Sequence, residues 1–412
     1  MKMLPVDEAV RRIFECVEVM GIETVPLVDS LDRILATDVI SPVDLPLFSH
    51  ATVDGYAICY HDVEHASKGK GVRLRVVETI SAGFLAKKAM KSGWAVRVMT
   101  GTPLPPGADA VVKEEDTSPA ENGTDSIQVE KSAVRMENVA SPGEDLRRGE
   151  VVLETGMTIR PGDIGILASL GIQQAEVFRL PEVALLSTGD ELVNLGEDLR
   201  PGTIFASSLY VLLAQLRECG CVPLVLGVVG DNTAEIEERI RSGMAADAII
   251  TIGGTRSGDS DWVRDVYCQM EIHSKVDGVA MSPGRSFLFG LLKEKPVFSL
   301  PGSPTACLVA FEELVKPALM KMKGRAQDQS WSLPTIRMSL EKRIRGARGL
   351  RKYILVRVVL QDGLLRAIPV SRKHRGALTP MIQTNGMVVL PEYRSEVQAN
   401  EEVDVKIFDL NL

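Results

Sequence analysis

The sequence predicts a multidomain protein in which an α/β domain with a parallel-rich sheet is combined with β-rich domains. The chain of 412 residues is too long for one ordinary domain and long enough for about two to four. Hydrophobic residues make up 45% and charged residues 25%, which is typical of a globular protein. Residues 182–325 alternate apolar runs with amphipathic segments, whereas residues 40–150 and 334–412 carry short alternating runs broken by Gly and Pro. The first pattern predicts strand–helix units and the second predicts β structure.

The elements can be predicted in order from the N-terminus. Residues 6–20 carry apolar side chains at helical spacing before Gly21, which predicts an amphipathic helix. Alternating runs such as 73–77 and 95–99 predict strands, and the polar residues 117–126 predict a loop.

The α/β segment has four continuously apolar runs, at 183–187, 222–229, 248–252 and 297–300. Helices are expected from Ser207, as an N-cap, to near Gly220, over 233–242, and from Pro304. This alternation predicts a parallel sheet that helices cover on both faces. Residues 324–334 form a fair domain boundary, and Gln361-Asp362-Gly363 predicts a hairpin in the last segment.

Charge and hydropathy exclude some classes of partner. The net charge of −8 argues against nucleic-acid binding, which requires clustered Lys and Arg. No stretch has the ~18–20 unbroken apolar residues of a membrane span. No apolar stretch of signal-peptide length precedes Asp7 and Glu8. We therefore expect a cytoplasmic protein without a nucleic-acid or membrane partner.

Glycines and polar side chains follow all four apolar runs of the α/β segment, at 187–191, 230–233, 253–261 and 301–305. Ligands of open parallel sheets bind at the carboxyl ends of the strands, so these loops should meet at one edge. Glycine lets backbone amides approach an anion, and hydroxyl groups add further donors. None of the loops is a Walker A loop or a dinucleotide fingerprint, so neither ATP hydrolysis nor hydride transfer is supported.

Acidic side chains in these loops indicate a metal ion. Glu191, Asp231, Asp259 and Asp261 would repel a phosphate unless Mg²⁺ lay between the carboxylates and the phosphate oxygens. The alternative is that Asp231, and Asp190 next to Glu191, cap helices.

Six short motifs occur in order along nearly the whole chain. They are TVDGYA at 52–57, MTGTPLP at 99–105, GED at 143–145, STGDEL at 187–192, GGTRSGDSD at 253–261 and LPGSP at 300–304. Each alone is weak, but together they resemble the molybdopterin molybdenumtransferase family, which includes the C-terminal domain of gephyrin. The resemblance implies four domains: a discontinuous N-terminal domain (1–45 plus 146–181), an inserted β-rich domain (46–145), a molybdopterin-binding α/β domain (182–326) and a small C-terminal β-barrel (327–412).

The resemblance also implies a reaction and a set of site residues. Molybdate is inserted into adenylylated molybdopterin with the help of Mg²⁺, and AMP is released, in molybdenum cofactor biosynthesis. The implied catalytic residues are Asp54, Thr100, Asp145, Glu191, Asp231, Asp261 and Arg285, of which Glu191, Asp231 and Asp261 hold the metal. The implied ligand cradle consists of Ser187, Thr188, Gly189, Gly253, Gly254, Arg256, Ser257, Gly258, Pro301, Gly302, Ser303 and Thr305.

The resemblance further implies a homodimer. In it, Asp54, Thr100 and Asp145 of one subunit reach the α/β domain of the other. Asp54 is open to a second interpretation, as a turn residue, and Thr100 as a structural loop hydroxyl. Molybdopterin adenylyltransferase and apo-molybdoenzymes are the expected pathway partners.

Several cationic positions of the family are changed. The stretch MSPGRS at 281–286 has Ser282 in place of a Lys and retains one charge as Arg285. Gly278 stands at another Lys position and Ala140 at an Arg position. We hypothesise that Arg256 partly compensates for these losses.

Three functions stay open at this stage. The retained carboxylates favour a molybdenumtransferase, with tungstate as an alternative oxyanion. The missing lysines favour a non-catalytic molybdopterin-binding carrier or scaffold. The third function is a nucleotide-handling hydrolase of the competence-damage family on the same α/β domain, and the DGYA and GED motifs count against it.

Overall fold

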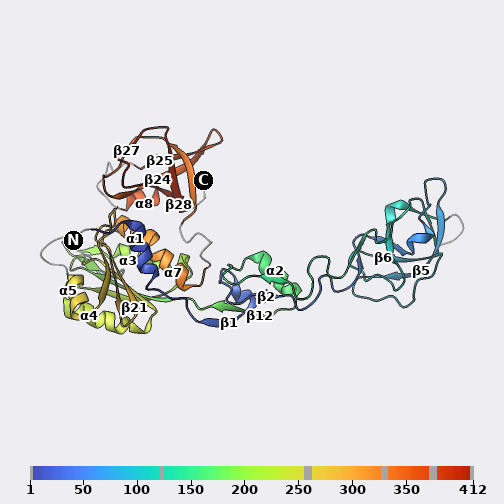
Figure 1. Ribbon diagram of the computed structural model, residues 1–412, viewed down its shortest axis with the longest axis horizontal. Coiled ribbons are helices and arrows are strands. Elements are labelled where there is room, and N and C mark those ends of the chain that lie inside the picture. Colours follow the sequence, from blue (N-terminus) through green and yellow to red (C-terminus); the bar gives the residue numbers. More distant parts are fainter. Residues whose placement is uncertain (1–2, 121–124, 255–261, 326–332, 371–377, 409–412) are drawn as a thin grey trace. The chain divides into compact units, whose positions relative to one another are not determined.

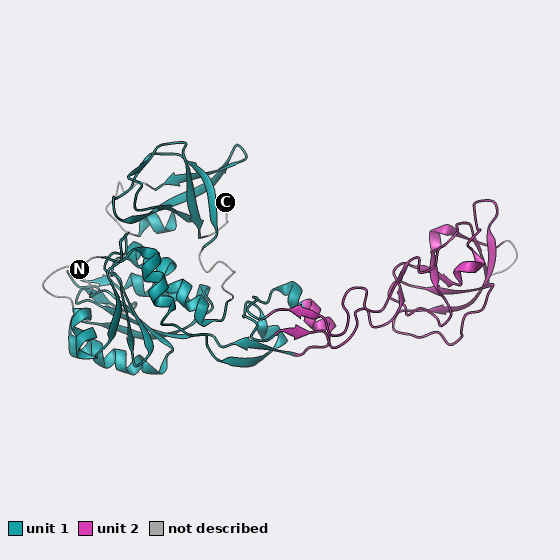
Figure 2. Cartoon of the chain, in the orientation of Figure 1, with its two compact units in different colours: residues 1–37, 155–164, 174–412 teal, residues 38–154, 165–173 magenta. Residues whose placement is uncertain are grey.

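The computed structural model describes residues 3–120, 125–254, 262–325, 333–370 and 378–408 (Figure 1). The chain divides into two compact units (Figure 2). Unit 1 consists of residues 1–37, 155–164 and 174–412, and unit 2 consists of residues 38–154 and 165–173. Unit 2 is therefore inserted in the sequence of unit 1. Among the described residues, no helix is long and apolar enough to cross a membrane.

The central sheet of unit 1 combines a parallel part with an antiparallel part. In order of pairing, its strands are β16 (Val222–Val229), β13 (Glu182–Thr188), β17 (Ala248–Ile252), β21 (Lys295–Leu300), β20 (Leu288–Leu292) and β18 (His273–Asp277). The strands from β16 to β21 run parallel to one another. The strand β20 pairs antiparallel with β21 on one side and with β18 on the other. The parallel strands coincide with the apolar runs in the sequence, whereas β18 and β20 are strands that the sequence analysis does not predict.

Helices cover both faces of this sheet, as predicted. Side chains of β13 alternate between two cores: Val183 and Leu185 lie in one, and Ala184 and Leu186 lie in the other. The first core is closed by α1 (Val6–Phe14), α3 (Ser207–Glu218), α6 (Pro304–Ala310) and α7 (Lys316–Met322). The second is closed by α4 (Thr233–Ser242) and α5 (Trp262–Gln269). A strand that is buried on both faces requires the continuously apolar pattern of its sequence.

The N-terminal helix is shorter than the predicted span of residues 6–20, since α1 ends at Phe14. The chain beyond it leaves the helix but stays packed: Val17 is buried, and Met20 N donates to Met322 O at 2.7 Å. The apolar spacing up to Met20 therefore reflects burial and not a longer helix.

The C-terminal segment of unit 1 forms the predicted small β-barrel. Among the described residues, five strands pair in a closed ring: β24 (Arg351–Gln361), β25 (Leu364–Pro369), β22 (Thr335–Leu340), β28 (Glu402–Ile407) and β26 (Gly386–Leu390), which pairs back onto β24. The hairpin predicted at 361–363 joins β24 to β25, and its turn residues Asp362 and Gly363 have φ of 53° and 76°. A short strand β19 (Met281–Ser282) also pairs with β24.

Unit 2 is rich in β structure, as predicted for the inserted segment. Its main sheet has the order β7 (Ala110–Lys113), β4 (Gly55–Ile58), β6 (Trp94–Val98), β5 (Val72–Ile80), β9 (Ser126–Val129) and β8 (Thr117–Pro119). The predicted loop 117–126 is wrong at both ends, because β8 and β9 pair there. The multidomain α/β and β fold class is thus confirmed, while the predicted four-domain boundaries stay a prediction.

Candidate functional site

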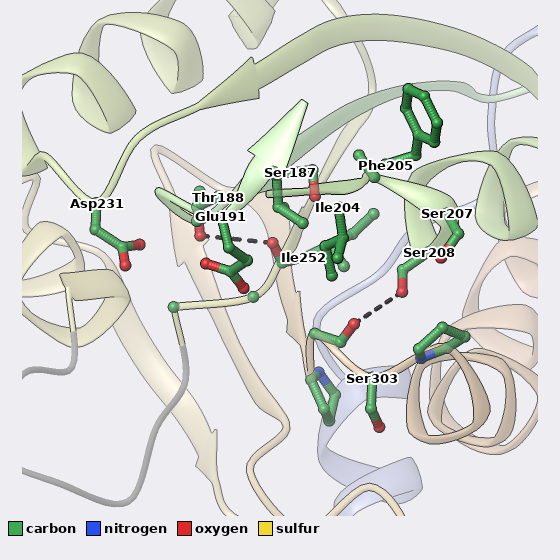
Figure 3. Close-up of a pocket in the computed structure, with 18 of the residues that line it drawn as sticks. Ser187, Thr188, Glu191, Ile204, Phe205, Ser207, Ser208, Asp231, Ile252 and Ser303 are labelled. Atoms are coloured by element: carbon green, nitrogen blue, oxygen red, sulfur yellow. Dashed lines mark hydrogen bonds between the residues drawn. The ribbon is translucent and has the colours of Figure 1, made fainter. Parts of the chain in front are cut away.

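A cavity of about 480 Å³ lies at the carboxyl ends of β13, β17 and β21 in unit 1 (Figure 3). The helices α3 and α6 begin at its wall. The structure brings together ten of the residues proposed from sequence: Ser187, Thr188, Gly189, Glu191, Asp231, Gly253, Gly254, Pro301, Gly302 and Ser303. The expectation that these strand-end loops meet at one edge of the sheet is met.

Glycines let the loops at this edge approach one another closely. Gly253 has φ of +91°, and a Cβ added there would lie 2.4 Å from Thr188 O. A side chain at Gly189 would lie 2.8 Å from Oε2 of Glu191. Thr188 Oγ1 donates to Ile252 O at 3.5 Å, so the ends of β13 and β17 are also joined by a hydrogen bond. Gly253 is therefore required for the shape of the cavity wall, whereas the carboxylate end of Glu191 can move away from a Cβ at Gly189.

One side of the cavity is acidic. Figure 3 shows Asp231 and Glu191 on the side opposite Ser208 and Ser303. Asp231 is not a helix cap, because Asn232 caps α4 and accepts from Ala234 N at 3.0 Å.

Asp190 is not a helix cap either. Its Oδ1 accepts from Asp231 N at 2.9 Å, and β14 (Leu192–Val193) follows it in the chain. The capping alternative is therefore wrong for both aspartates, and Asp190 instead ties the loop after β13 to the loop after β16.

Serine hydroxyls gather on the other side. Ser208 Oγ donates to Gly302 O at 2.8 Å, which joins α3 to the loop after β21. Ser207 is the first residue of α3 and lines the cavity. The N-cap is Ala206, whose methyl group cannot accept a hydrogen bond from the helix. The predicted N-cap role of Ser207 is therefore wrong.

The cavity wall carries no compensating cation among the residues that the structure describes: its charged members there are Glu191 and Asp231. Ser286 lines the cavity, whereas neither Arg285 nor Thr305 does. Among the described residues, no group of three or more His, Cys, Asp or Glu side chains could hold a metal ion. The proposed third ligand Asp261 and the cradle residues Arg256, Ser257 and Gly258 lie outside the described residues.

A small apolar flap completes the wall and was not predicted from sequence. It consists of β14, paired in parallel with β15 (Ile204–Phe205), and Leu192, Ile204 and Phe205 all line the cavity. Trp262, the first residue of α5, lines it as well. The apolar pair Ile204-Phe205 directly before α3 is the one local signal that could have indicated the flap.

Unit 2 brings Asp54 and Thr100 into direct contact. The N–H and the hydroxyl of Thr100 donate to Asp54 Oδ1 at 2.7 and 2.9 Å. These two hydrogen bonds, the backbone one first, hold the pKa of Asp54 below its ordinary value. Pairing of β4 with β6 at Gly55 and Val98 places the two residues side by side. The bonds also suit the alternative in which both residues stabilise a turn.

Asp145 lies in a separate cavity of unit 2, of about 660 Å³, which Glu144, Arg147 and Glu150 also line. The backbone of Asp145 is held by its N–H, which donates to Leu45 O at 2.9 Å. This cavity is polar and its carboxylates belong to turns: Glu144 accepts from Ser141 N, and Glu150 accepts from Arg147 N.

We expect Thr100→Val to raise the pKa of Asp54 toward its ordinary value, because the hydroxyl donor is lost while the Thr100 N–H remains. A depressed folded-state pKa stabilises the fold above the unfolded pKa, and this contribution is lost as the pH falls through the folded pKa. The variant should therefore lose this contribution at a higher pH than the parent protein. The measurement is an NMR titration of the Asp54 carboxyl carbon. Thr117→Val, whose hydroxyl donates to Glu114 O, is the control and should leave the titration unchanged.

Family descriptions match successive parts of the chain. Residues 4–171 match the "MoeA N-terminal region (domain I and II)", residues 184–321 a "probable molybdopterin binding domain", and residues 337–408 the "MoeA C-terminal region (domain IV)". The molybdopterin molybdenumtransferase of Bacillus subtilis is 33% identical over 390 residues, which cover 94% of this chain and 90% of that protein. The Haemophilus influenzae protein of the same name is 32% identical over 416 residues, covering 99% of each.

A solved structure agrees with these matches over the whole chain. The molybdopterin biosynthesis MoeA protein from Pyrococcus horikosii has a TM-score of 0.85 and 32% sequence identity, and the similarity covers 99% of this chain and 100% of that one.

Proposed function

The chain belongs to the molybdopterin molybdenumtransferase family, enzymes of molybdenum cofactor biosynthesis, and on this premise we propose that it inserts molybdate into adenylylated molybdopterin with Mg²⁺ and releases AMP. The observation that carries the proposal is the composition of the unit 1 cavity. Two carboxylates line it together with serine hydroxyls and glycine backbone. A pyrophosphate and two carboxylates fit in one cavity only if a cation lies between them.

The donor set suits a hard divalent cation. Carboxylate and hydroxyl oxygens are the ligands that Mg²⁺ prefers, and Glu191 and Asp231 supply the former. Bound there, Mg²⁺ would neutralise charge that develops on the phosphate oxygens as AMP leaves. Ser187, Ser207 and Ser303 donate hydrogen bonds to the phosphate oxygens and orient the substrate. Asp261, beyond the described residues, is the proposed third metal ligand.

The proposal includes a homodimer in which unit 2 of one subunit supplies Asp54, Thr100 and Asp145 to the cavity of the other. The contact between Thr100 and Asp54 supports a shared role, because it holds the carboxylate and the hydroxyl beside each other. Arg285, adjacent to the cavity-lining Ser286, is the nearest cation in the sequence to that wall. Molybdopterin adenylyltransferase and apo-molybdoenzymes are the proposed pathway partners.

A second function, a non-catalytic molybdopterin carrier, is favoured by one observation. The part of the cavity wall that the structure describes has no Lys, Arg or His. Each missing charge-assisted hydrogen bond to an oxyanion forgoes about 1.5–3 kcal/mol of binding. A protein that holds the pterin but does not recruit molybdate or tungstate would have such a wall.

The deciding experiment is a cofactor-formation assay. Purified protein receives adenylylated molybdopterin and Mg²⁺ with either molybdate or tungstate, and AMP release is followed. Release with metal insertion, abolished by a chelator, supports the enzyme, and the preferred oxyanion identifies the substrate. Tight pterin binding without AMP release in either oxyanion overturns the enzyme proposal in favour of the carrier. Absence of binding contradicts both.

A further inference from the structure

Two consecutive carboxylates are buried in a short π-helix behind the cavity. The π-helix η5 (Phe311–Val315) continues α6, which begins at the cavity, and leads directly into α7. Glu312 is 4% exposed and Glu313 is 7% exposed. Buried carboxylates are costly unless partners compensate them, and π-turns inside α-helices are rare and often accompany functional sites.

Glu312 ties this helix to α3. Gln215 Nε2, on α3, donates to Glu312 Oε1 at 2.9 Å, and Lys316 Nζ donates to Oε2 at 2.8 Å. Burial disfavours the charged ammonium of Lys316, but Glu312 outweighs it and the pKa of Lys316 is raised. At the cavity end, Ser208 joins α3 to Gly302. The two helical runs that begin at the cavity are thus connected at both ends.

Glu313 binds the barrel instead. Tyr353 OH, on β24, donates to Glu313 Oε2 at 3.0 Å, and Lys406 on β28 forms an ion pair with Oε1. Burial, together with the charge of Glu313, raises the pKa of the Tyr353 phenol. No described residue of the barrel lines the cavity. An effect of the barrel on the cavity must therefore pass through contacts such as those of Tyr353 and Lys406 with Glu313.

The π-turn sets the register between α6 and α7. A π-turn contains an extra residue compared with an α-turn. If η5 relaxed to α-helix, α6 would shift by one residue relative to α7, a rotation of about 100°. Ser303 and Pro304, which precede and begin α6 and line the cavity, would move with it.

We propose that Glu313, held by Tyr353 and Lys406 of the barrel, is a positioning residue that keeps the π-turn and thereby sets the place of Ser303 and Pro304 in the cavity. The inference goes beyond the proposed function, because it assigns the barrel a task that needs no contact with substrate. It also accounts for two adjacent buried glutamates that take no part in the cavity wall.

The test compares Tyr353→Phe with Tyr393→Phe. Both remove one phenol hydroxyl from the C-terminal segment, but Tyr393 is exposed, whereas Tyr353 is buried and bonded to Glu313. We expect amide hydrogen exchange in residues 303–310 to rise about tenfold in Tyr353→Phe, as for loss of one hydrogen bond to a charged group. Tyr393→Phe should leave these amides unchanged. Glu313→Gln, which leaves Lys406 without its ion-pair partner, should raise the exchange at least as much as Tyr353→Phe.

Equal exchange of residues 303–310 in Tyr353→Phe and the parent protein, or an equal rise in both variants, overturns the proposal. If Tyr353→Phe does not fold, Lys406→Met replaces it in the same comparison. A second readout is the KM of the adenylylated pterin, expected to rise about tenfold in Tyr353→Phe and less than twofold in Tyr393→Phe. The KM readout rests on the proposed function, whereas the hydrogen-exchange readout does not. If the protein proved inactive, hydrogen exchange would still decide the role of Glu313.

Discussion

Glu191→Gln is expected to lower AMP release at least about 100-fold while the fold is retained, since the carboxylate that we propose as a metal ligand is replaced by a neutral amide of the same size. Glu191 lines the unit 1 cavity with Asp231, and the described wall has no cation to anchor a phosphate in its place. The variant should therefore also bind Mg²⁺ more weakly. AMP release at saturating molybdate and Mg²⁺ titration by calorimetry measure the two effects.

Glu197→Gln is the matched control. Glu197 lies between β14 and β15, in the same segment as Glu191, but it does not line the cavity and its carboxylate bonds Asn194. The activity of Glu197→Gln should stay within about twofold of that of the parent protein, as expected for a surface change away from the site. Equal activity of Glu191→Gln and Glu197→Gln would rule out the proposed metal site at Glu191.

Gly253→Ala is expected to abolish pterin binding and to destabilise unit 1. The added Cβ would lie 2.4 Å from Thr188 O, a backbone atom that cannot move without displacing the end of β13. The φ of +91° adds a further cost for any L side chain. We expect a loss of at least about 3 kcal/mol in unfolding free energy, as the two penalties add.

Gly196→Ala separates the two penalties. Gly196 has φ of +92°, but nothing lies within 4 Å of an added Cβ. Its variant should lose only about 1–2 kcal/mol and keep pterin binding. Denaturant unfolding and a pterin-binding titration give both quantities. If the two variants behaved alike, backbone conformation and not the close approach of the loops would explain the effect, and the account of the cavity wall given above would be wrong.

The sequence by itself determined the parallel strands of the central sheet and the acidic and hydroxyl parts of the cavity. Continuous apolar runs predicted the parallel strands because a strand that is covered on both faces has few positions for a polar side chain. Side chains of β13 enter two cores in alternation, as that pattern requires. The loops after these strands met as expected, because parallel strands present all their carboxyl ends at one edge. The hairpin at 361–363 followed from local turn chemistry alone.

Short local patterns were less informative where several structures suit the same residues. Val17 and Met20 continue the helical spacing of α1, yet the helix ends at Phe14, since burial alone accounts for their apolar character. Next to α4, the sequence allows Asp231 as a cap, and only the structure shows that Asn232 accepts the bonds instead. The strands β18 and β20 likewise depend on antiparallel pairing with each other, and the hydrophobic periodicity of the sequence does not indicate this pairing.

Only the tertiary structure decided which distant residues act together. The flap pairs Leu192 with Ile204, and Ser286 reaches the cavity from the segment between β19 and β20. Gln215 and Glu312 are 97 residues apart, and Tyr353 and Glu313 are 40 apart. A glutamate pair in a helical sequence is ordinarily solvated, and the apolar residues around this pair do not reveal which partners compensate its charges. Burial and charge compensation depend on what the rest of the chain packs against a residue, so they are properties of the fold and not of the local sequence.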